Sequence, residues 1–184
     1  MRKLIYAINL TIDGCFDHTK VIGDEAMLEY WTHVLREADL LVYGRITYQL
    51  MVPYWPDVAK NHSMAKAEND FADTFDSLDK VVFSRSLERA EDKKTRIVRT
   101  DLQDEILKLK QQEGRDILLG GVALPSQLIA LGLVDEFLFV IHPVIAGEGK
   151  RLMEGIDLQE RLQLRLVESK ILKSGCVALR YLKQ

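Results

Sequence analysis

Cysteine is scarce in this sequence, and its scarcity excludes two classes of protein. Only two of the 184 residues are cysteines, Cys15 and Cys176. Two cysteines do not make the disulfide framework of a small secreted domain, and neither stands in a C-x-x-C or zinc-ligand pattern. We therefore expect two free thiols and no metal site.

Long apolar runs and an excess of one charge are also absent. No apolar run approaches the roughly 20 residues of a membrane-spanning helix, and the N-terminal stretch turns polar at Asn9, too soon for a secretory signal. The formal net charge is −3, and lysine and arginine are scattered rather than gathered in a basic stripe. Such a pattern does not suit nucleic-acid phosphates. We expect a cytoplasmic protein that binds neither nucleic acid nor membranes.

The residues that are present predict one α/β domain spanning residues 1–184. Apolar residues make up 47% of the chain and charged residues 29%, which is ordinary for a globular protein. Short stretches rich in β-branched and aromatic residues predict strands at 3–10, 40–43, 80–84, 96–99, 117–119, 134–142, 162–168 and 176–182. Helical spacing of apolar residues predicts helices at 24–37, 62–75, 101–113 and 122–131.

The order of these elements indicates how the sheet is built. Helices separate most of the early strands, whose short apolar runs suit strands buried on both faces, so we expect a largely parallel sheet with helices on each side. The last three strands follow one another without a helix, which predicts an antiparallel extension at one edge. Asp24 and Asp101 are the expected N-caps of two helices, and Gly114 and Gly132 are the expected C-cap glycines.

Residues 117–124, ILLGGVAL, place two glycines between a strand and a helix. At such a corner, backbone N–H groups and the positive end of the helix dipole point outward and can hold a phosphate. The alternative is that Gly120 and Gly121 only allow the helix to pack closely on the strand. The spacing matches neither G-x-G-x-x-G with a later acid nor G-x-x-x-x-G-K-[ST], so any nucleotide site must be of another kind.

Two further apolar stretches end in groups that suit phosphates. In LLVYGRITYQL, Gly44 permits a tight turn and Arg45 can reach an anion, unless the pair is only a turn followed by a solvated charge. In VVFSRSL, Ser84 and Arg85 offer a hydroxyl and a guanidinium, unless they belong to an exposed polar loop. Because ligands bind at the carboxyl ends of parallel strands, we expect the three corners to meet at one cleft.

Five ordered motifs give the sequence a family resemblance. TIDG, YGRITYQ, VVFSRSL, ILLGGVALPSQLIALGLVDEF and HPVIAGEGKRLMEG together resemble the dihydrofolate reductase superfamily. The closer likeness is to the C-terminal reductase domain of the bacterial riboflavin-biosynthesis deaminase/reductase (RibD). The resemblance implies a dihydrofolate reductase-like three-layer α/β fold, in which a mostly parallel eight-stranded sheet has an antiparallel C-terminal edge and flanking helices.

The resemblance also implies an activity. NADPH would bind across the strand ends, and hydride would pass to a small pteridine-like or ribosylaminopyrimidine-like substrate, as in 5-amino-6-(5-phosphoribosylamino)uracil reductase or dihydrofolate reductase. The residues implied along the cofactor phosphates are Gly44, Arg45 and Thr47, with Ser84 and Arg85 at the 2′-phosphate. Those implied at the pyrophosphate and nicotinamide side are Gly120, Gly121, Val122, Ala123 and Leu124. In the dihydrofolate reductases the peptide that matches Gly120–Gly121 is cis.

The substrate side is predicted from the loops after the first strand and after His142. In this superfamily the loop at residues 11–25 closes over the nicotinamide, which makes Asp13 a catalytic candidate; the alternative is a turn-forming aspartate. The substrate-binding candidates are Asn9, Trp31, Pro143 and Ile145. Tyr48 is the second catalytic candidate, although aromatic residues at helical spacing, such as Tyr48 and Trp31, also suit a core.

The first helix keeps a second function possible. True dihydrofolate reductases carry an acid on the first helix, where this chain has Leu28, with Glu25 and Glu29 one helical step away. The alternative to a reductase is therefore a non-catalytic NADP(H)-binding protein. Strands near 134–142 and 162–182 are long and apolar, and an uncovered edge invites pairing, so we expect a homodimer.

Overall fold

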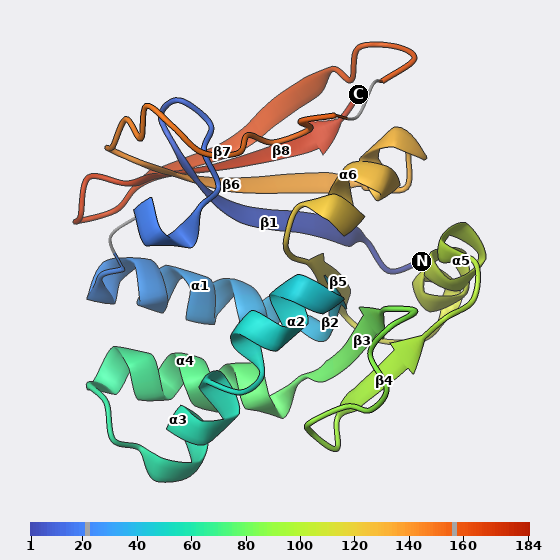
Figure 1. The fold of residues 1–184 in the computed structure, drawn as a ribbon. Helices are drawn as coiled ribbons and strands as arrows, with labels where there is room; N and C mark the ends of the chain where they lie inside the picture. The colour runs from blue at the N-terminus through green and yellow to red at the C-terminus, as the bar shows by residue number, and fades with distance from the viewer. Residues whose placement is uncertain (21–22, 156–157) are drawn as a thin grey trace.

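The computed structural model describes residues 1–20, 23–155 and 158–184, in which eight strands form one sheet (Figure 1). The strands are β1 (Leu4–Thr11), β2 (Ala38–Gly44), β3 (Asp79–Phe83), β4 (Thr95–Val98), β5 (Asp116–Leu119), β6 (Glu136–His142), β7 (Leu164–Ile171) and β8 (Val177–Lys183). The helices are η1 (His18–Lys20), α1 (Glu25–Glu37), α2 (Arg45–Met51), α3 (Trp55–Asn61), α4 (Lys66–Ser77), α5 (Leu102–Gln111) and α6 (Ala123–Ala130). Each predicted strand and helix is confirmed, and α2 and α3 are additional.

The strand order is β4-β3-β2-β5-β1-β6-β8-β7. All neighbouring pairs from β4 to β6 are parallel, whereas β8 pairs antiparallel with both β6 and β7. This confirms the mostly parallel sheet with an antiparallel C-terminal edge. The expectation that residues 134–142 lie at an uncovered edge is wrong, because β6 is interior, between β1 and β8, and the edge strand is β7.

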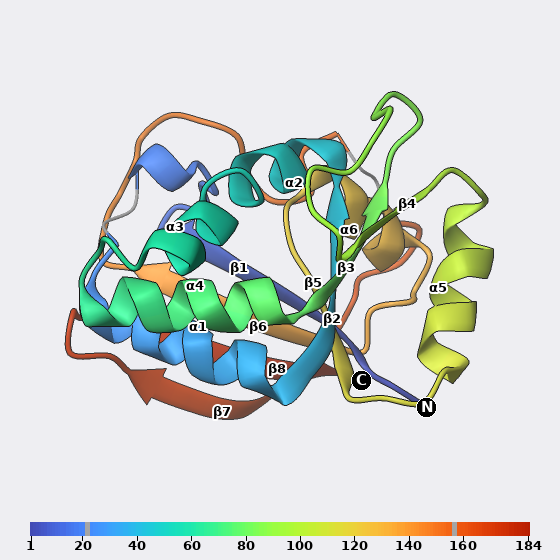
Figure 2. The ribbon, with the colours of Figure 1, turned by 90° about the horizontal axis from the view of Figure 1, so that it is seen from below.

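Helices cover both faces of the sheet, and the alternation of side chains explains why. Leu4 and Tyr6 of β1 pack in one apolar cluster with residues of α5 and α6, while Ile5 packs in a second cluster with residues of α1, α2 and α4. Successive strand residues point to opposite faces, so a strand that is apolar throughout needs cover on both. Figures 1 and 2 show α1 and α4 on one side of the sheet and α5 and α6 on the other.

The helix ends follow the expected chemistry except at one glycine. The side chains of Asp24 and Asp101 cap α1 and α5 by accepting the N–H groups of Met27 and Asp104. Gly132 follows α6 with φ +69°, a conformation that favours glycine. Gly114 is not a C-cap, because α5 ends at Gln111 with Gln112 as its cap, and Gly114 lies in the turn beyond.

Two further properties concern the chain as a whole. Among the described residues, no helix combines the length and the apolar character needed to cross a membrane. Cys15 and Cys176 are both buried and both free.

Candidate cofactor and substrate site

Six parallel strands end at the same edge of the sheet, which we call the carboxyl edge, and the five from β3 to β6 carry the predicted residues. In sheet order the residues at or just after the strand ends are Ser84 (β3), Gly44 (β2), Gly120 (β5), Thr11 (β1) and His142 (β6). Five strands in a row span about 19 Å at the usual spacing of about 4.8 Å. The residues predicted for the cofactor lie at the ends of β3, β2 and β5. Of those predicted for the substrate, Asp13, Pro143 and Ile145 follow β1 and β6, whereas Asn9 lies within β1 and the other two lie on helices.

The Gly120–Gly121 corner is glycine-only for two reasons. A Cβ on Gly120 would lie 2.5 Å from Cε1 of Tyr43, and a Cβ on Gly121 would collide with the hydroxyl of Thr47. Gly121 also has φ +92°, in the region that side chains disfavour. The prediction of a cis Gly–Gly peptide is wrong, since every peptide bond between described residues is trans. Close approach and a positive φ, rather than a cis bond, require glycine here.

The corner leads into α6 with its first N–H groups free of a side-chain cap. The N-cap residue Val122 makes no side-chain hydrogen bond, in contrast to the aspartate caps of α1 and α5. Val122 is half-buried and Ala123 is exposed, while Leu124 packs inward. A Cβ on Gly44 would lie 3.6 Å from Cβ of Leu124, so the turns after β2 and β5 meet. Uncapped N–H groups beside a glycine turn can bind an anion.

Cationic and hydroxyl side chains lie at the β2 and β3 ends of the same edge. The exposed Arg45 donates to Gln49 at 2.8 Å within α2. The Oγ of Ser84 accepts the N–H of Leu87 at 2.9 Å, which leaves the hydroxyl hydrogen as a donor. Arg85 is exposed and follows directly. Because Phe83 and Gly44 are register partners in β3 and β2, Ser84 follows β3 at the level where Arg45 begins α2.

Tyr48, predicted as a catalytic residue on the substrate side, lies in the core, which fits the alternative of a core aromatic. Its side chain is 0% exposed and belongs to the apolar cluster beneath α1, α2 and α4. The hydroxyl accepts the N–H of Glu91 at 2.8 Å and donates to Asp92 at 3.3 Å. Burial raises the pKa of this phenol.

Asn9 and Trp31, two of the predicted substrate residues, are brought together. The indole N–H of Trp31 on α1 donates to the side-chain oxygen of Asn9 on β1 at 3.0 Å. Both side chains are half-buried, and Trp31 packs against the apolar clusters. The bond fixes α1 over the end of β1, so the two residues form one structural unit near the carboxyl edge.

Asp13, predicted as a catalytic residue, anchors two loops to each other. Its carboxylate accepts the hydroxyl of Thr11 at 2.6 Å and the N–H groups of Ala146 and Gly147 at 3.0 Å each. An ion pair with Arg151 at 3.4 Å completes the set. Bonds to the charged form, led by that from Thr11, hold the pKa of Asp13 far below its usual value. An ionised carboxylate engaged at both oxygens does not donate a proton.

The loop after β6 places its candidates at the surface. Pro143 is exposed and Ile145 is 72% exposed, while His142 before them is fully buried. The Nδ1 of His142 lies 3.4 Å from Sγ of Cys176, and burial lowers the pKa of the imidazole. The contact of His142 is thus made inside the fold, away from the surface.

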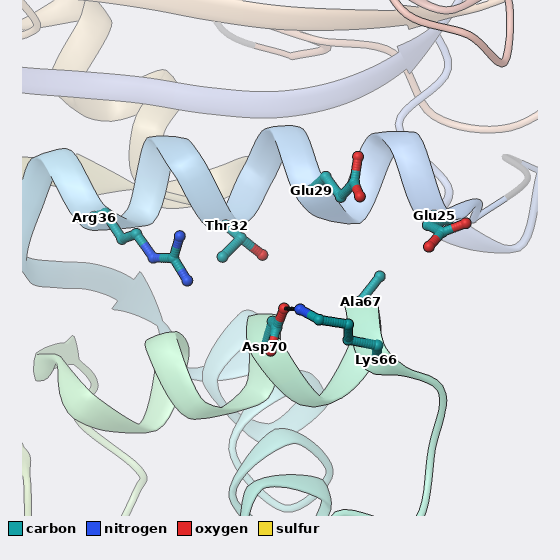
Figure 3. Close-up of a pocket in the computed structure, with 7 residues that line it drawn as sticks. All are labelled: Glu25, Glu29, Thr32, Arg36, Lys66, Ala67 and Asp70. Carbon is teal, nitrogen blue, oxygen red and sulfur yellow. Dashed lines mark hydrogen bonds and ion pairs between the residues drawn. The ribbon is translucent and has the colours of Figure 1, made fainter.

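Two cavities lie away from the predicted residues. One, of about 230 Å³, lies between α1 and α4 and is lined by Glu25, Glu29, Thr32, Arg36, Lys66, Ala67 and Asp70 (Figure 3). The other, of about 560 Å³, lies beside α6 and includes Lys183 and Gln184. The two glutamates of the first helix therefore line a groove shared with α4. Residues 21–22 of the loop expected to close over nicotinamide lie outside the described residues.

Several residues that shape the site were not identified from the sequence. The hydroxyl of Tyr6 donates to the carbonyl of Gly121 at 2.9 Å, and Tyr43 packs against Gly120. The side chain of Arg151 donates to both the backbone carbonyl and the carboxylate of Asp13. Tyr6 and Tyr43 lie inside apolar stretches that predict buried strands, but such a pattern does not predict which group each ring contacts. Long-range contacts of this kind have no local pattern.

The fold has solved counterparts. Acinetobacter baumannii RibD is similar with a TM-score of 0.73 and 17% identity, and the match covers 100% of this chain and 58% of that one. The deaminase/5-amino-6-(5-phosphoribosylamino)uracil reductase of Thermotoga maritima is similar with a TM-score of 0.66 and 16% identity, covering 100% of this chain and 57% of that one. At these identities the likeness shows the dihydrofolate reductase-like fold.

A closer relative in sequence is the uncharacterised protein YyaP of Bacillus subtilis. It is 34% identical over 184 residues, which cover 98% of this chain and 94% of that protein. The RibD C-terminal domain family matches residues 2–178. By this match over nearly its whole length, the chain belongs to the RibD C-terminal domain family.

Proposed function

We propose that this protein is an NADPH-dependent reductase that transfers a hydride to a small heterocyclic substrate. The observation that carries the proposal is the carboxyl edge itself, where predicted phosphate-binding residues follow three adjacent parallel strands, β3, β2 and β5. Ligands of open α/β sheets bind at such an edge. Membership of a family that contains reductases supports the same reaction class.

The residues at this edge fit a phosphorylated dinucleotide. A glycine corner without Cβ atoms and the uncapped start of α6 suit a pyrophosphate. Arg45 and Arg85 are both exposed, so neither guanidinium is consumed by a buried ion pair. When bound, NADPH would supply a hydride for an electrophilic ring or imine carbon and leave as NADP⁺, while a proton completes the reduced substrate.

Cofactor binding is the first test. Titration of the protein with NADPH and with NADH, followed by tryptophan fluorescence and calorimetry, should give a tighter Kd for NADPH. Binding of NADPH no tighter than the low millimolar range would refute the proposal. Loss of absorbance of the reduced nicotinamide on adding pteridines or ribosylaminopyrimidines would then identify the substrate class.

Arg85→Glu tests the residue proposed for the 2′-phosphate. Losing a charge-assisted bond costs on the order of 2 kcal/mol, so we expect a roughly 30-fold weaker Kd for NADPH and a much smaller change for NADH. Arg161→Glu, an equal charge reversal at an exposed arginine before β7, is the control. Equal losses for the two cofactors in the Arg85 variant would remove Arg85 from this role.

A non-catalytic NADP(H)-binding protein is the second candidate. It is favoured by the placement of Glu25 and Glu29 in the groove against α4 and by the engaged carboxylate of Asp13. Neither arrangement offers an acid to protonate a substrate beside the hydride acceptor. Hydride transfer to any pteridine, ribosylaminopyrimidine or small carbonyl compound would reject this candidate.

A further inference from the structure

Tyr48 joins helix α2 to the β3–β4 connection, residues 84–94. Its hydroxyl accepts the N–H of Glu91 at 2.8 Å and donates to Oδ1 of Asp92 at 3.3 Å. The ring is 0% exposed, so the hydroxyl is held in one place by packing. One buried side chain of α2 thus makes two hydrogen bonds to the same connection.

A buried lysine supports Asp92 from the other side. Oδ2 of Asp92 lies 3.5 Å from Nζ of Lys80, whose side chain is 0% exposed. Nζ also donates to the carbonyl of Leu78 at 2.9 Å and lies 4.8 Å from the ring centroid of Phe75. Burial lowers the pKa of Lys80, although the charge of Asp92 opposes this. An apolar pair is often as stable as a buried ion pair, so stability alone does not account for this arrangement.

The beginning of the connection is fixed as well. Oγ of Ser84 accepts the N–H of Leu87, and Arg99 donates to the carbonyl of Leu87. Leu87 is buried in the same apolar cluster as Tyr48. The connection is therefore held at both ends against the face that carries α2, with the exposed Arg85 near its start.

We infer that Tyr48 is a positioning residue for the cofactor: by holding Glu91 and Asp92 it fixes the β3–β4 connection against α2. It thereby sets the place of Ser84 and Arg85 relative to Arg45 and Thr47 without touching a ligand. This inference rests on the proposed function and adds to it the residue that governs discrimination between NADPH and NADH. Only NADPH has the 2′-phosphate, and only the β3–β4 connection would hold that group. Loosening the connection should therefore weaken the binding of NADPH more than that of NADH.

Tyr48→Phe tests the inference because it removes both hydrogen bonds and keeps the ring. If the connection then spends about a tenth of the time in its binding arrangement, the apparent Kd for NADPH rises about tenfold. For NADH we expect a change of about threefold or less, since most of its contacts lie on α2 and α6. Tyr181→Phe is the matched control, because Tyr181 lies on β8, remote from the connection, and packs against Phe139.

Asp92→Asn is the second variant and keeps the test informative if Tyr48→Phe folds poorly. The amide retains an oxygen for the Tyr48 hydroxyl but removes the charge beside Lys80. Like Tyr48→Phe, Asp92→Asn should lower the preference for NADPH over NADH. The double variant should lose less NADPH binding free energy than the two single variants together, as expected for groups in one network.

The outcomes separate this inference from the function it rests on. A lower melting temperature with an unchanged NADPH-to-NADH affinity ratio in both variants, measured where circular dichroism shows folded protein, would overturn the inference and leave the proposed function standing. A shifted ratio in the variants of Tyr48 and Asp92, but not of Tyr181, would support it. Failure of the unaltered protein to bind either cofactor would refute the proposed function and this inference with it.

Discussion

Gly121 combines two constraints that one substitution can separate. Its φ of +92° disfavours any side chain, and a Cβ there would also collide with Thr47. Gly121→Ala should lower the free energy of unfolding by about 1–2 kcal/mol for the backbone and about 1–3 kcal/mol more for the collision. Chemical denaturation measures the sum of the two effects on the free energy of unfolding. Cofactor titration should show weaker binding.

Gly147→Ala is the control for the collision at Gly121. Gly147 has a comparable φ of +73°, yet nothing lies within 4 Å of the position that its Cβ would take. It should therefore lose only the backbone part. Equal destabilisation of the two variants would mean that Thr47 gives way and that the corner is not sterically closed.

His142 should make the stability of the protein depend on pH in the weakly acidic range. Burial lowers the pKa of its imidazole, and the charge of Asp24 only partly opposes this. The unfolded chain then binds a proton that the native state does not, so the free energy of unfolding falls as pH drops below about 6.5, by at most about 1.4 kcal/mol per pH unit. Above that range the contribution of His142 is complete and constant.

Denaturation at a series of pH values tests this expectation. His142→Gln cannot titrate and should flatten the profile between neutral pH and the lowered pKa. His33→Gln, at an exposed histidine on α1, should leave the profile as it is. An unchanged slope in the His142 variant would show that other groups cause the acid sensitivity.

The positions of single residues are easier to predict from the sequence than the contacts of their side chains. Gly44, Ser84 and Gly120 follow their strands as predicted, because a strand end is visible as an apolar run that stops at glycine or serine. The contacts of Asp13 and Tyr48 could not be predicted because their partners lie far away in the sequence, at Gly147 for the one and at Glu91 and Asp92 for the other. The direction of a side chain depends on such partners.

At the scale of elements, Asp13 ties the end of β1 to the loop after β6. Its carboxylate accepts the N–H groups of Ala146 and Gly147, and Ile12 donates its own N–H to the carbonyl of Val144. Asp13→Ala should therefore speed amide hydrogen exchange at residues 146 and 147 while leaving the sheet protected. We also expect weaker binding of any substrate that lies against this loop.

Glu148→Gln provides the comparison for Asp13→Ala. Glu148 pairs with Lys20 across the same two loops at 2.7 Å, but its side chain is 73% exposed. Exposed ion pairs contribute little, so exchange at residues 146 and 147 should stay nearly unchanged. Similar exchange in both variants and the unaltered protein would mean that backbone bonds alone hold the loop.

Helices and strands could be predicted from the sequence where the periodic pattern of apolar residues extends over enough residues. All strands and the four longer helices lie close to their expected bounds. The helices α2 and α3 have seven residues each and flank Pro53, so their pattern is too short to read as helical. The order of strands in the sheet, by contrast, depends on long-range pairing, which is why β6 was expected at an edge but lies inside.

At the scale of the whole molecule, the two ends of the parallel strands differ in chemistry. The end opposite the carboxyl edge holds ion pairs between Arg2 and Asp39, Lys110 and Asp135, and Arg180 and Glu136. Arg2, Lys110 and Glu136 are buried there, whereas Arg45 and Arg85 at the carboxyl edge are exposed. Buried members of ion pairs thus lie at one end, and the two guanidinium groups that we propose for the cofactor are exposed at the other.

The sheet has two edge strands, β4 and β7, and we expect a homodimer to form through β7. Most of its residues are exposed, with Leu166 at 49% and Ile171 at 80%. β7 is the last strand in the order, so its outer backbone groups have no strand partner among the described residues. Such an edge pairs readily with another strand unless charges prevent it.

We therefore predict that two copies associate through β7. Light scattering and sedimentation across a concentration series should show a dimer, and Leu166→Lys with Ile171→Lys should shift it to monomer, because lysines on an edge strand repel a second copy. Leu131→Lys adds a charge at an exposed leucine after α6 and should not change the assembly. A monomer at all concentrations, or a dimer that survives the β7 substitutions, would contradict this interface, and in the second case another surface must carry the contact.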